Sequence, residues 1–196
     1  MLLIDAASAV IQVGALASVS AGDRWTRSSA DAGTGIFENL AALPMTPADC
    51  GAFIYCDGPG SILGIRSAAA ALRAWLVVGP RPVFAYHSLS LVARGLEQPG
   101  QQVIADARRG LWHRCAGSGS LERVPAAELG ENLLMPEGFR HWSPLPPGVT
   151  STSYDLPSLL ARAQDEALFT ETNEPDAFLH EEPSYVTWTP HVHRSP

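Results

Sequence analysis

The sequence contains no lysine, so arginine supplies all 13 of its basic side chains. The 20 acidic residues leave a formal net charge of −7. Nucleic-acid binding needs clustered cations that neutralise phosphates, so this balance argues against direct binding of nucleic acid. Long apolar runs are also missing, since no stretch approaches the roughly 20 apolar residues of a membrane-spanning helix. The initial run Met1 to Ile4 ends at Asp5, far short of the apolar core of a signal peptide. We therefore expect a cytoplasmic protein without membrane contact.

The residues that build metal and catalytic sites are few and unsuitably spaced. The three cysteines, Cys50, Cys56 and Cys115, lack the spacing of metal ligands, which favours reduced core thiols. The six histidines contain no His-x-x-x-His pair, and no Gly-x-Ser-x-Gly elbow occurs. His191 and His193 are more typical of a solvated tail than of a ligand pair. We expect no metal site and no catalytic machinery.

Hydrophobic patterning predicts an α/β protein. With 196 residues, 46% of them hydrophobic, the chain can form one large domain or two small ones. Short apolar runs predict strands at residues 2–4, 9–18, 24–27, 52–55, 83–86, 102–105 and 111–115. Helical spacing predicts helices at 61–78, 88–96 and about 156–169, with a shorter signal at 33–44. Residues 135–157 are Pro-rich and irregular, and an acidic linker precedes a short tail at 185–188.

Two places in the sequence indicate an internal repeat. Ile4-Asp5-Ala6 and Ala105-Asp106-Ala107 both close a first strand just before its hairpin partner. Only the Asp-Ala pair is identical, but its shared position predicts two similar α/β halves. We place a first lobe at residues 1–98 and a reduced second lobe, with a Pro-rich loop and a tail, at residues 99–196.

A buried strand, a glycine-proline turn and a helix follow one another at residues 53–66. Gly58 and Gly60 can adopt backbone angles that other residues resist, and Ser61 is a natural N-cap. Free amides at such a helix N-terminus can bind an anion. Because the segment lacks the Lys-Ser/Thr pair of a Walker loop, we favour the alternative, a tight turn that packs the helix close to the sheet.

The helix after this turn is apolar nearly all round. One face consists of Ile62, Ile65, Ala69, Leu72 and Leu76, and a second, adjacent face of Ala68, Ala71 and Trp75. Only Arg66 and Arg73 form a polar stripe. A helix of this kind must be buried on two sides, against the sheet and against either the second half or another chain. We favour another chain.

Several segments, in order, resemble the TsaB (YeaZ-type) family of glycoprotease-like (peptidase M22-like) proteins. Leu3-Ile4-Asp5-Ala6-Ala7-Ser8 resembles the opening strand and turn of that family, and Gly58-Pro59-Gly60-Ser61 with Gly64-Ile65-Arg66 resembles its most specific signature. Ser88-Leu89, Asp106-Ala107-Arg108 and Glu182-Pro183-Ser184-Tyr185-Val186 follow in the expected order. The resemblance is good as far as Cys115 and describes a diverged, shortened member. The long first helix of the family is reduced here to residues 35–43.

The resemblance implies an actin/Hsp70-like ATPase (ribonuclease H-like) fold with two duplicated lobes. It also implies a non-catalytic accessory subunit that helps a TsaD-type catalytic subunit, together with a TsaE-type ATPase, to make threonylcarbamoyladenosine on transfer RNA. The chain alone is expected to form a homodimer. The partner surface is expected at Gly58, Pro59, Gly60, Ser61, Ile62, Ile65, Arg66, Ala68, Ala69, Leu72 and Trp75.

Actin-like ATPases place acidic residues near a bound metal–nucleotide, which makes Asp5, Ser8 and Asp106 the candidates for binding ATP and magnesium here. An Asp at the end of a strand often only caps a turn, and no convincing adenosine motif is present. We therefore favour turn capping and expect no cofactor. Two alternatives to the accessory role stay open: a diverged nucleotide-binding protein, and a homodimeric paralogue outside the modification pathway.

Overall fold

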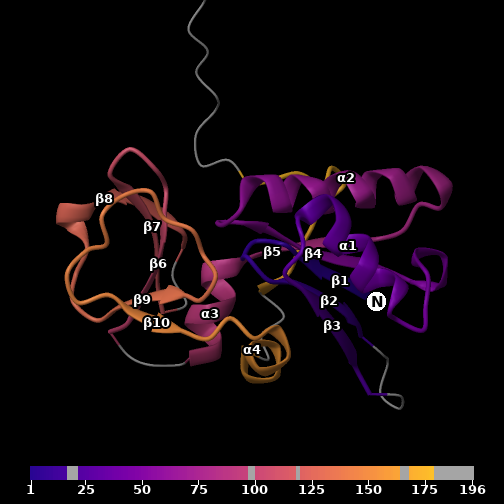
Figure 1. Cartoon of the computed structure of the whole chain (residues 1–196), viewed down its shortest axis with the longest axis horizontal. Helices are drawn as coiled ribbons and strands as arrows, with labels where there is room; N and C mark the ends of the chain where they lie inside the picture. Colours follow the sequence, from indigo (N-terminus) through magenta and orange to yellow (C-terminus); the bar gives the residue numbers. More distant parts are fainter. Residues whose placement is uncertain (17–21, 97–99, 118–119, 164–167, 179–196) are drawn as a thin grey trace, which may run out of the picture.

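Two β-sheets lie side by side, with helices between them and over the outer face of the first sheet (Figure 1). The computed structural model describes residues 1–16, 22–96, 100–117, 120–163 and 168–178. Both sheets mix parallel and antiparallel pairs, and the described residues include four α-helices. The predicted α/β class is confirmed.

The first sheet has six strands in the order β11-β5-β4-β1-β2-β3. They are β1 (Leu2–Asp5), β2 (Ile11–Ala15), β3 (Arg24–Ser28), β4 (Phe53–Gly58), β5 (Val83–His87) and β11 (Thr170–Glu171). β1, β4 and β5 run parallel, whereas β2, β3 and β11 add antiparallel pairs. Because β11 pairs with β5, the end of the described chain returns to the first sheet.

The second sheet repeats this arrangement with five strands in the order β10-β9-β6-β7-β8. They are β6 (Gln102–Asp106), β7 (Leu111–Ala116), β8 (Glu122–Pro125), β9 (Leu133–Pro136) and β10 (Thr150–Thr152). β6 pairs antiparallel with β7 and parallel with β9, as β1 pairs with β2 and β4. The strand order and directions thus repeat, as the two Asp-Ala positions predict.

The helices are distributed unevenly between the two repeats. α1 (Ala32–Ala41) joins β3 to β4, α2 (Ile62–Val78) joins β4 to β5, and α3 (Ser88–Leu96) follows β5. In the second repeat, the β8–β9 connection holds only the short 3₁₀ helix η2 (Ala126–Glu128), and the β9–β10 connection holds no helix. α4 (Leu156–Ala163) follows β10, and a further 3₁₀ helix, η1 (Pro47–Asp49), precedes β4.

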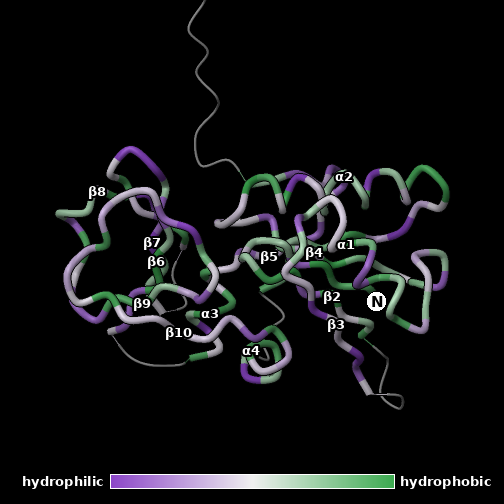
Figure 2. The backbone as a smooth tube through the Cα atoms, viewed as in Figure 1, coloured by the Kyte–Doolittle hydropathy of each residue, from purple (hydrophilic) through white to green (hydrophobic). Residues whose placement is uncertain are grey.

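Alternate residues of the first sheet enter two different cores. Leu2 and Ile4 point into a core that α1 and α2 cover, whereas Leu3 points to the opposite face. That opposite core contains residues of α3, α4 and the second sheet, so α3 lies between the two sheets. The apolar colouring of Figure 2 follows these central strands.

A buried glutamine fixes the second half to the first sheet. The Gln12 side-chain amide donates to the carbonyl of Tyr154 at 2.7 Å, and its oxygen accepts the Leu156 N–H at 3.1 Å. Both bonds are buried, so they satisfy backbone groups that would otherwise lose hydrogen bonds to water. Gln12 thereby sets the position at which α4 begins.

Most predicted elements of the first 116 residues are present. α3 spans the predicted residues 88–96, and Ser61 caps α2 with its hydroxyl accepting the Gly64 N–H. The prediction fails at β8, β9 and β10, which are three or four residues long; β8 and β9 contain prolines, and β8 and β10 bury few residues. The predicted helix at 156–169 ends at Ala163 within the described part. The segments 182–186 and 185–188, His191 and His193 lie outside the described residues.

No helix in the described ranges is long and apolar enough to cross a membrane. The predicted boundary between lobes falls at residues 97–99, which lie outside the described ranges.

Candidate functional site

The turn that opens α2 is packed directly on the backbone of the β1–β2 connection. The Ser61 N–H donates to the Ala7 carbonyl at 2.7 Å. A Cβ added at Gly60 would lie 2.4 Å from the Ala7 oxygen, and one at Gly64 would lie 2.0 Å from the Ala6 oxygen. Only glycine allows this approach, so the close-packing interpretation explains both residues. Two amides of this helix N-terminus are already bonded within the chain.

The predicted partner surface is divided by the fold into buried and exposed residues. The buried members are Gly58, Pro59, Ile65, Ala68, Ala69 and Leu72. Gly60, Ser61 and Trp75 are partly exposed, and Ile62 and Arg66 are exposed. Ala71, from the second apolar face predicted for this helix, is also buried. The opposite side of α2 is exposed rather than covered, because Leu63, Val77 and Val78 are exposed there.

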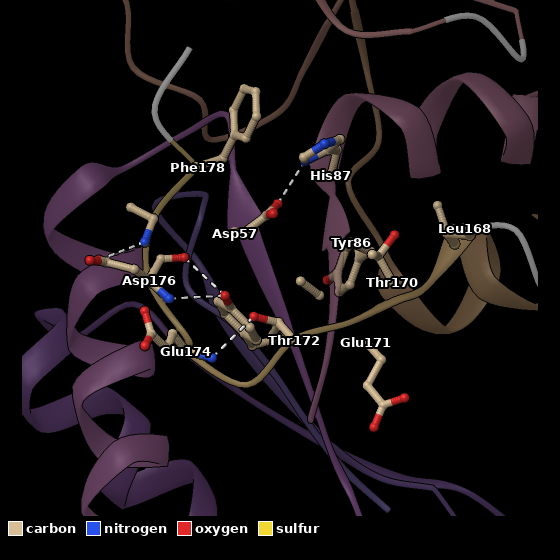
Figure 3. Close-up of a pocket in the computed structure, with 13 residues that line it drawn as sticks. Asp57, Tyr86, His87, Leu168, Thr170, Glu171, Thr172, Glu174, Asp176 and Phe178 are labelled. Carbon is tan, nitrogen blue, oxygen red and sulfur yellow. Dashed lines mark hydrogen bonds and ion pairs between the residues drawn. The ribbon is translucent and has the colours of Figure 1, made fainter. Parts of the chain in front are cut away.

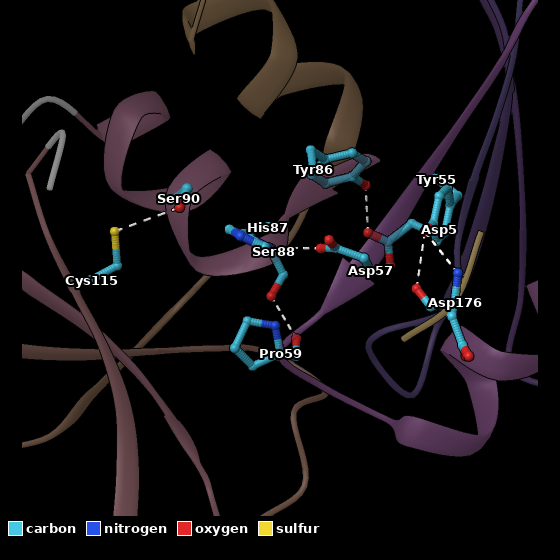
Figure 4. A network of polar contacts seen from close by, with 10 residues as sticks. All are labelled: Asp5, Tyr55, Asp57, Pro59, Tyr86, His87, Ser88, Ser90, Cys115 and Asp176. Carbon is cyan, nitrogen blue, oxygen red and sulfur yellow. Dashed lines mark hydrogen bonds and ion pairs between the residues drawn. The ribbon is translucent and has the colours of Figure 1, made fainter. Parts of the chain in front are cut away.

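Asp5 ends β1 and is completely buried (Figure 4). The hydroxyls of Tyr86 and Tyr154 donate to its Oδ2 at 2.5 and 2.6 Å, and the Ala7 N–H donates to its Oδ1 at 2.9 Å. Burial raises the pKa of Asp5, and these hydrogen bonds offset that effect only in part. Ser8 bonds with the backbone two residues further on. Asp5 therefore ties the two halves together and presents no surface to a metal–nucleotide.

Asp106 occupies the equivalent position of the second repeat and caps a turn. Its Oδ1 accepts the Arg108 N–H at 2.5 Å, and its Oδ2 accepts the N–H groups of Trp142 and Ser143 at 2.5 and 2.7 Å. Burial acts to raise the pKa of Asp106, but these backbone donors outweigh it and lower the pKa. Turn capping, the favoured interpretation, describes this geometry, and each of the three nucleotide candidates is engaged within the chain.

A pocket of about 390 Å³ reaches the carboxyl ends of β4 and β5 (Figure 3). Asp57 from β4 and His87 from β5 line it together with the segment 168–178. Asp57 Oδ1 lies 2.7 Å from His87 Nδ1, and the His87 ring packs on Phe178 with ring centroids 4.7 Å apart. The Phe178 N–H donates to the Asp57 carbonyl at 2.7 Å, which holds this segment across the strand end.

The electrostatics of this pocket centre on Asp57, whose side chain is 14% exposed against 33% for His87. Burial raises the pKa of Asp57, and the hydrogen bond from His87 offsets part of that rise. Tyr55 donates to the Asp176 carbonyl at 2.9 Å and accepts the Asp176 N–H at 3.0 Å. Burial raises the pKa of Tyr55 to about 12, so its phenol is neutral at physiological pH.

Metal ligands do not gather in the part of the chain that the structure describes. No group of three or more His, Cys, Asp or Glu side chains there could hold an ion. Cys50, Cys56 and Cys115 are free and buried.

The sequence matches no protein-family model, and no curated protein matches it significantly. Solved structures do match. YeaZ from Pseudomonas aeruginosa aligns with a TM-score of 0.60 over 91% of this chain and 98% of its own, at 17% identity. An uncharacterized protein with similarity to peptidase YeaZ from Pseudomonas aeruginosa aligns with a TM-score of 0.56 over 83% of this chain and 88% of its own, at 18% identity. This chain has the fold of YeaZ.

The resemblance to YeaZ-type proteins predicted from the sequence is confirmed at the level of the fold. The alignment extends well beyond Cys115, where the sequence motifs become weak. The YeaZ fold therefore extends into the second sheet, where β8, β9 and β10 carry little sequence signal.

Asp57 and His87 are not among the site residues predicted from the sequence. Asp57 lies two residues after the predicted strand 52–55 and His87 directly after the predicted strand 83–86, and the carboxyl ends of parallel strands meet at one edge of a sheet. Two titratable residues at successive strand ends are the signal that would have found this pair.

Proposed function

We propose that this chain belongs to the TsaB (YeaZ-type) family and is a non-catalytic accessory subunit in threonylcarbamoyladenosine formation on transfer RNA. Binding to a TsaD-type catalytic subunit would be its task, with a TsaE-type ATPase in the same assembly. The observation that carries the proposal is the YeaZ fold, which extends over 91% of this chain and 98% of YeaZ. The glycines Gly60 and Gly64 of the Gly58–Arg66 motif support it, because they allow α2 to pack closely on the backbone of the β1–β2 connection.

The repeated strand order supports two duplicated lobes of the actin/Hsp70-like type, divided near residue 98. Absence of a long helix from the described connections 126–132 and 137–149 supports a reduced second lobe. Reduction there leaves the helices of the first lobe as the principal surface for a partner.

The contact is proposed on the exposed side of α1 and α2, which lie next to each other over the first sheet (Figure 1). The resemblance to TsaB-type proteins implies pairing with the catalytic subunit through the equivalent two helices. Phe37 on α1 is 51% exposed and Leu63 on α2 is 74% exposed. The Phe37 ring meets the Trp75 ring edge-on, with the ring centroids 6.4 Å apart. Large apolar side chains on the surface of a small protein often mark an interface. In the absence of the partner, the same surface would pair two copies of this chain.

Size-exclusion chromatography with light scattering, using this protein with the TsaD-type protein of the same organism, tests the proposal. The wild-type chain should form a mixed complex, and Leu63→Glu should abolish it because a charge would be buried in the contact. Leu145→Glu, at an exposed leucine outside both helices, is the matched control and should leave the complex intact. A mixture that never forms a complex would refute the accessory role, and an unaffected Leu63→Glu variant would refute the surface.

A further inference from the structure

The pocket beside Asp57 and His87 lies where helices leave the first sheet in opposite directions. α2, which follows β4, packs on the face that carries Leu2 and Ile4, whereas α3, which follows β5, packs on the face that carries Leu3. β4 and β5 are adjacent and parallel. In open α/β sheets, ligands bind outside the carboxyl ends of two such strands, where the connections diverge. This pocket therefore has the position of a ligand site.

The lining of the pocket is rich in hydrogen-bond acceptors and poor in cations. Among the residues that the structure describes, it includes four carboxyl side chains, Asp57, Glu171, Glu174 and Asp176, and no arginine. Arg73 approaches only Asp176, with an N–O distance of 3.8 Å at the exposed rim. An anionic ligand such as a phosphate would therefore find mainly negative charge along this lining.

Asp57 and His87 point toward one another at the pocket (Figure 3). Asp57 Oδ1 and His87 Nδ1 lie 2.7 Å apart, and a neutral imidazole that donates from Nδ1 to this carboxylate presents Nε2 as an acceptor. The threonine hydroxyls at 170 and 172 add further acceptors, and Phe178 adds an aromatic face. A group with several N–H donors and a positive charge matches this set.

We propose that this pocket binds a small organic cation bearing a primary ammonium or guanidinium group, with Asp57 as its counter-ion. The cation would supply a positive charge beside the Asp57 carboxylate, whose side chain is largely buried. None of the lining residues belongs to the partner contact proposed on α1 and α2, so this site does not rest on the proposed function.

NMR titration of the full chain with n-butylammonium and agmatine tests the site, with butyrate and 1-butanol as the anionic and neutral counterparts. We expect saturable shifts of the His87 ring and Thr172 methyl signals with the two cations, and none with butyrate or 1-butanol. Shifts that fail to saturate at millimolar concentrations, or that butyrate produces equally, would overturn the proposal.

Asp57→Asn keeps the shape of the side chain and removes its charge, so the affinity for agmatine should fall about tenfold or more. Glu128→Gln, at an exposed acid on η2, is the matched control and should leave the affinity unchanged. If Asp57→Asn disturbs the fold, Glu174→Gln at the pocket rim serves instead and should weaken binding about twofold. Unchanged agmatine affinity in the pocket variant that folds would refute the assignment.

Discussion

The two sheets share a strand order but differ in what covers them. Helices cover both faces of the first sheet, whereas the second sheet has a small separate core covered by loop residues. The buried members of that core are Ile104, Trp112 and Leu133, packed by Leu129, Met135 and Val149. The comparison indicates that the strand order can be kept without covering helices when one large side chain, here Trp112, fills the space over the sheet.

Truncation of Trp112 should therefore test this difference between the two sheets most strongly. Its side chain is 1% exposed, and Trp112→Ala should lower the free energy of unfolding by about 3–5 kcal/mol, since truncation leaves a cavity that loops cannot fill. Urea unfolding measures the change. Trp142→Ala is the matched control, because Trp142 is 59% exposed. Its ring centroid lies 4.2 Å from Cζ of Arg108, and loss of this cation–π contact should lower the free energy of unfolding by about 0.5–1 kcal/mol. Equal losses in the two variants would show that Trp112 does not replace a covering helix.

Gly64 lies in α2, a helix that has no counterpart in the described part of the second repeat. Helix propensity alone would favour Gly64→Ala by about 1 kcal/mol. A Cβ there would lie 2.0 Å from the Ala6 carbonyl, so we expect a net loss of about 1–3 kcal/mol instead. Thermal unfolding measures it, with Gly51→Ala as control because no atom lies within 4 Å of its added Cβ. A stabilised Gly64→Ala variant would show that α2 does not need this close contact.

The strands that form short apolar runs bounded by turn residues could be predicted from the sequence, and those without such runs could not. β1, β4 and β5 are short buried runs bounded by turn residues. Thr150–Thr152 forms β10 through parallel pairing with β9, although its side chains carry no apolar alternation. Its pairing follows from the fold around it, which local sequence does not encode.

The same limit applies to the candidate sites. The role of Gly60 followed from the local glycine-proline pattern, because a tight turn is a local property, whereas the close approach of Gly64 to Ala6 was not predicted. Burial of Ala68 and Ala71 depended on how α1 and the sheet cover α2, which helical periodicity does not determine. The Asp57–His87 pair depends on the parallel pairing of β4 with β5, and its residues are 30 positions apart in the sequence.

The smallest expected effect is on the pH dependence of stability, and it distinguishes Asp5 from Asp106, the residues that end the first strand of each repeat. Burial raises the pKa of Asp5 above its usual value, so the native state binds this proton more tightly than the unfolded state. Its contribution to stability is present below the unfolded pKa, near 3.8, and is lost as pH rises through the folded pKa. Asp106 has the opposite sign: backbone donors overcome the effect of burial and lower its pKa, so its contribution is present above 3.8 and lost as pH falls through the folded pKa.

Asp5→Asn should consequently gain stability relative to the wild type as pH rises from 4 towards 7. Asp106→Asn should lose about 1 kcal/mol relative to the wild type through weaker capping of its turn, and this loss should develop mainly as pH rises towards 4. Urea unfolding of both variants at a series of pH values measures the two slopes. Each variant is the control for the other, since the substitution and the position in the repeat are the same. Parallel slopes would mean that burial of Asp5 between Tyr86 and Tyr154 does not disfavour its charge, and that the two repeats treat their first Asp alike.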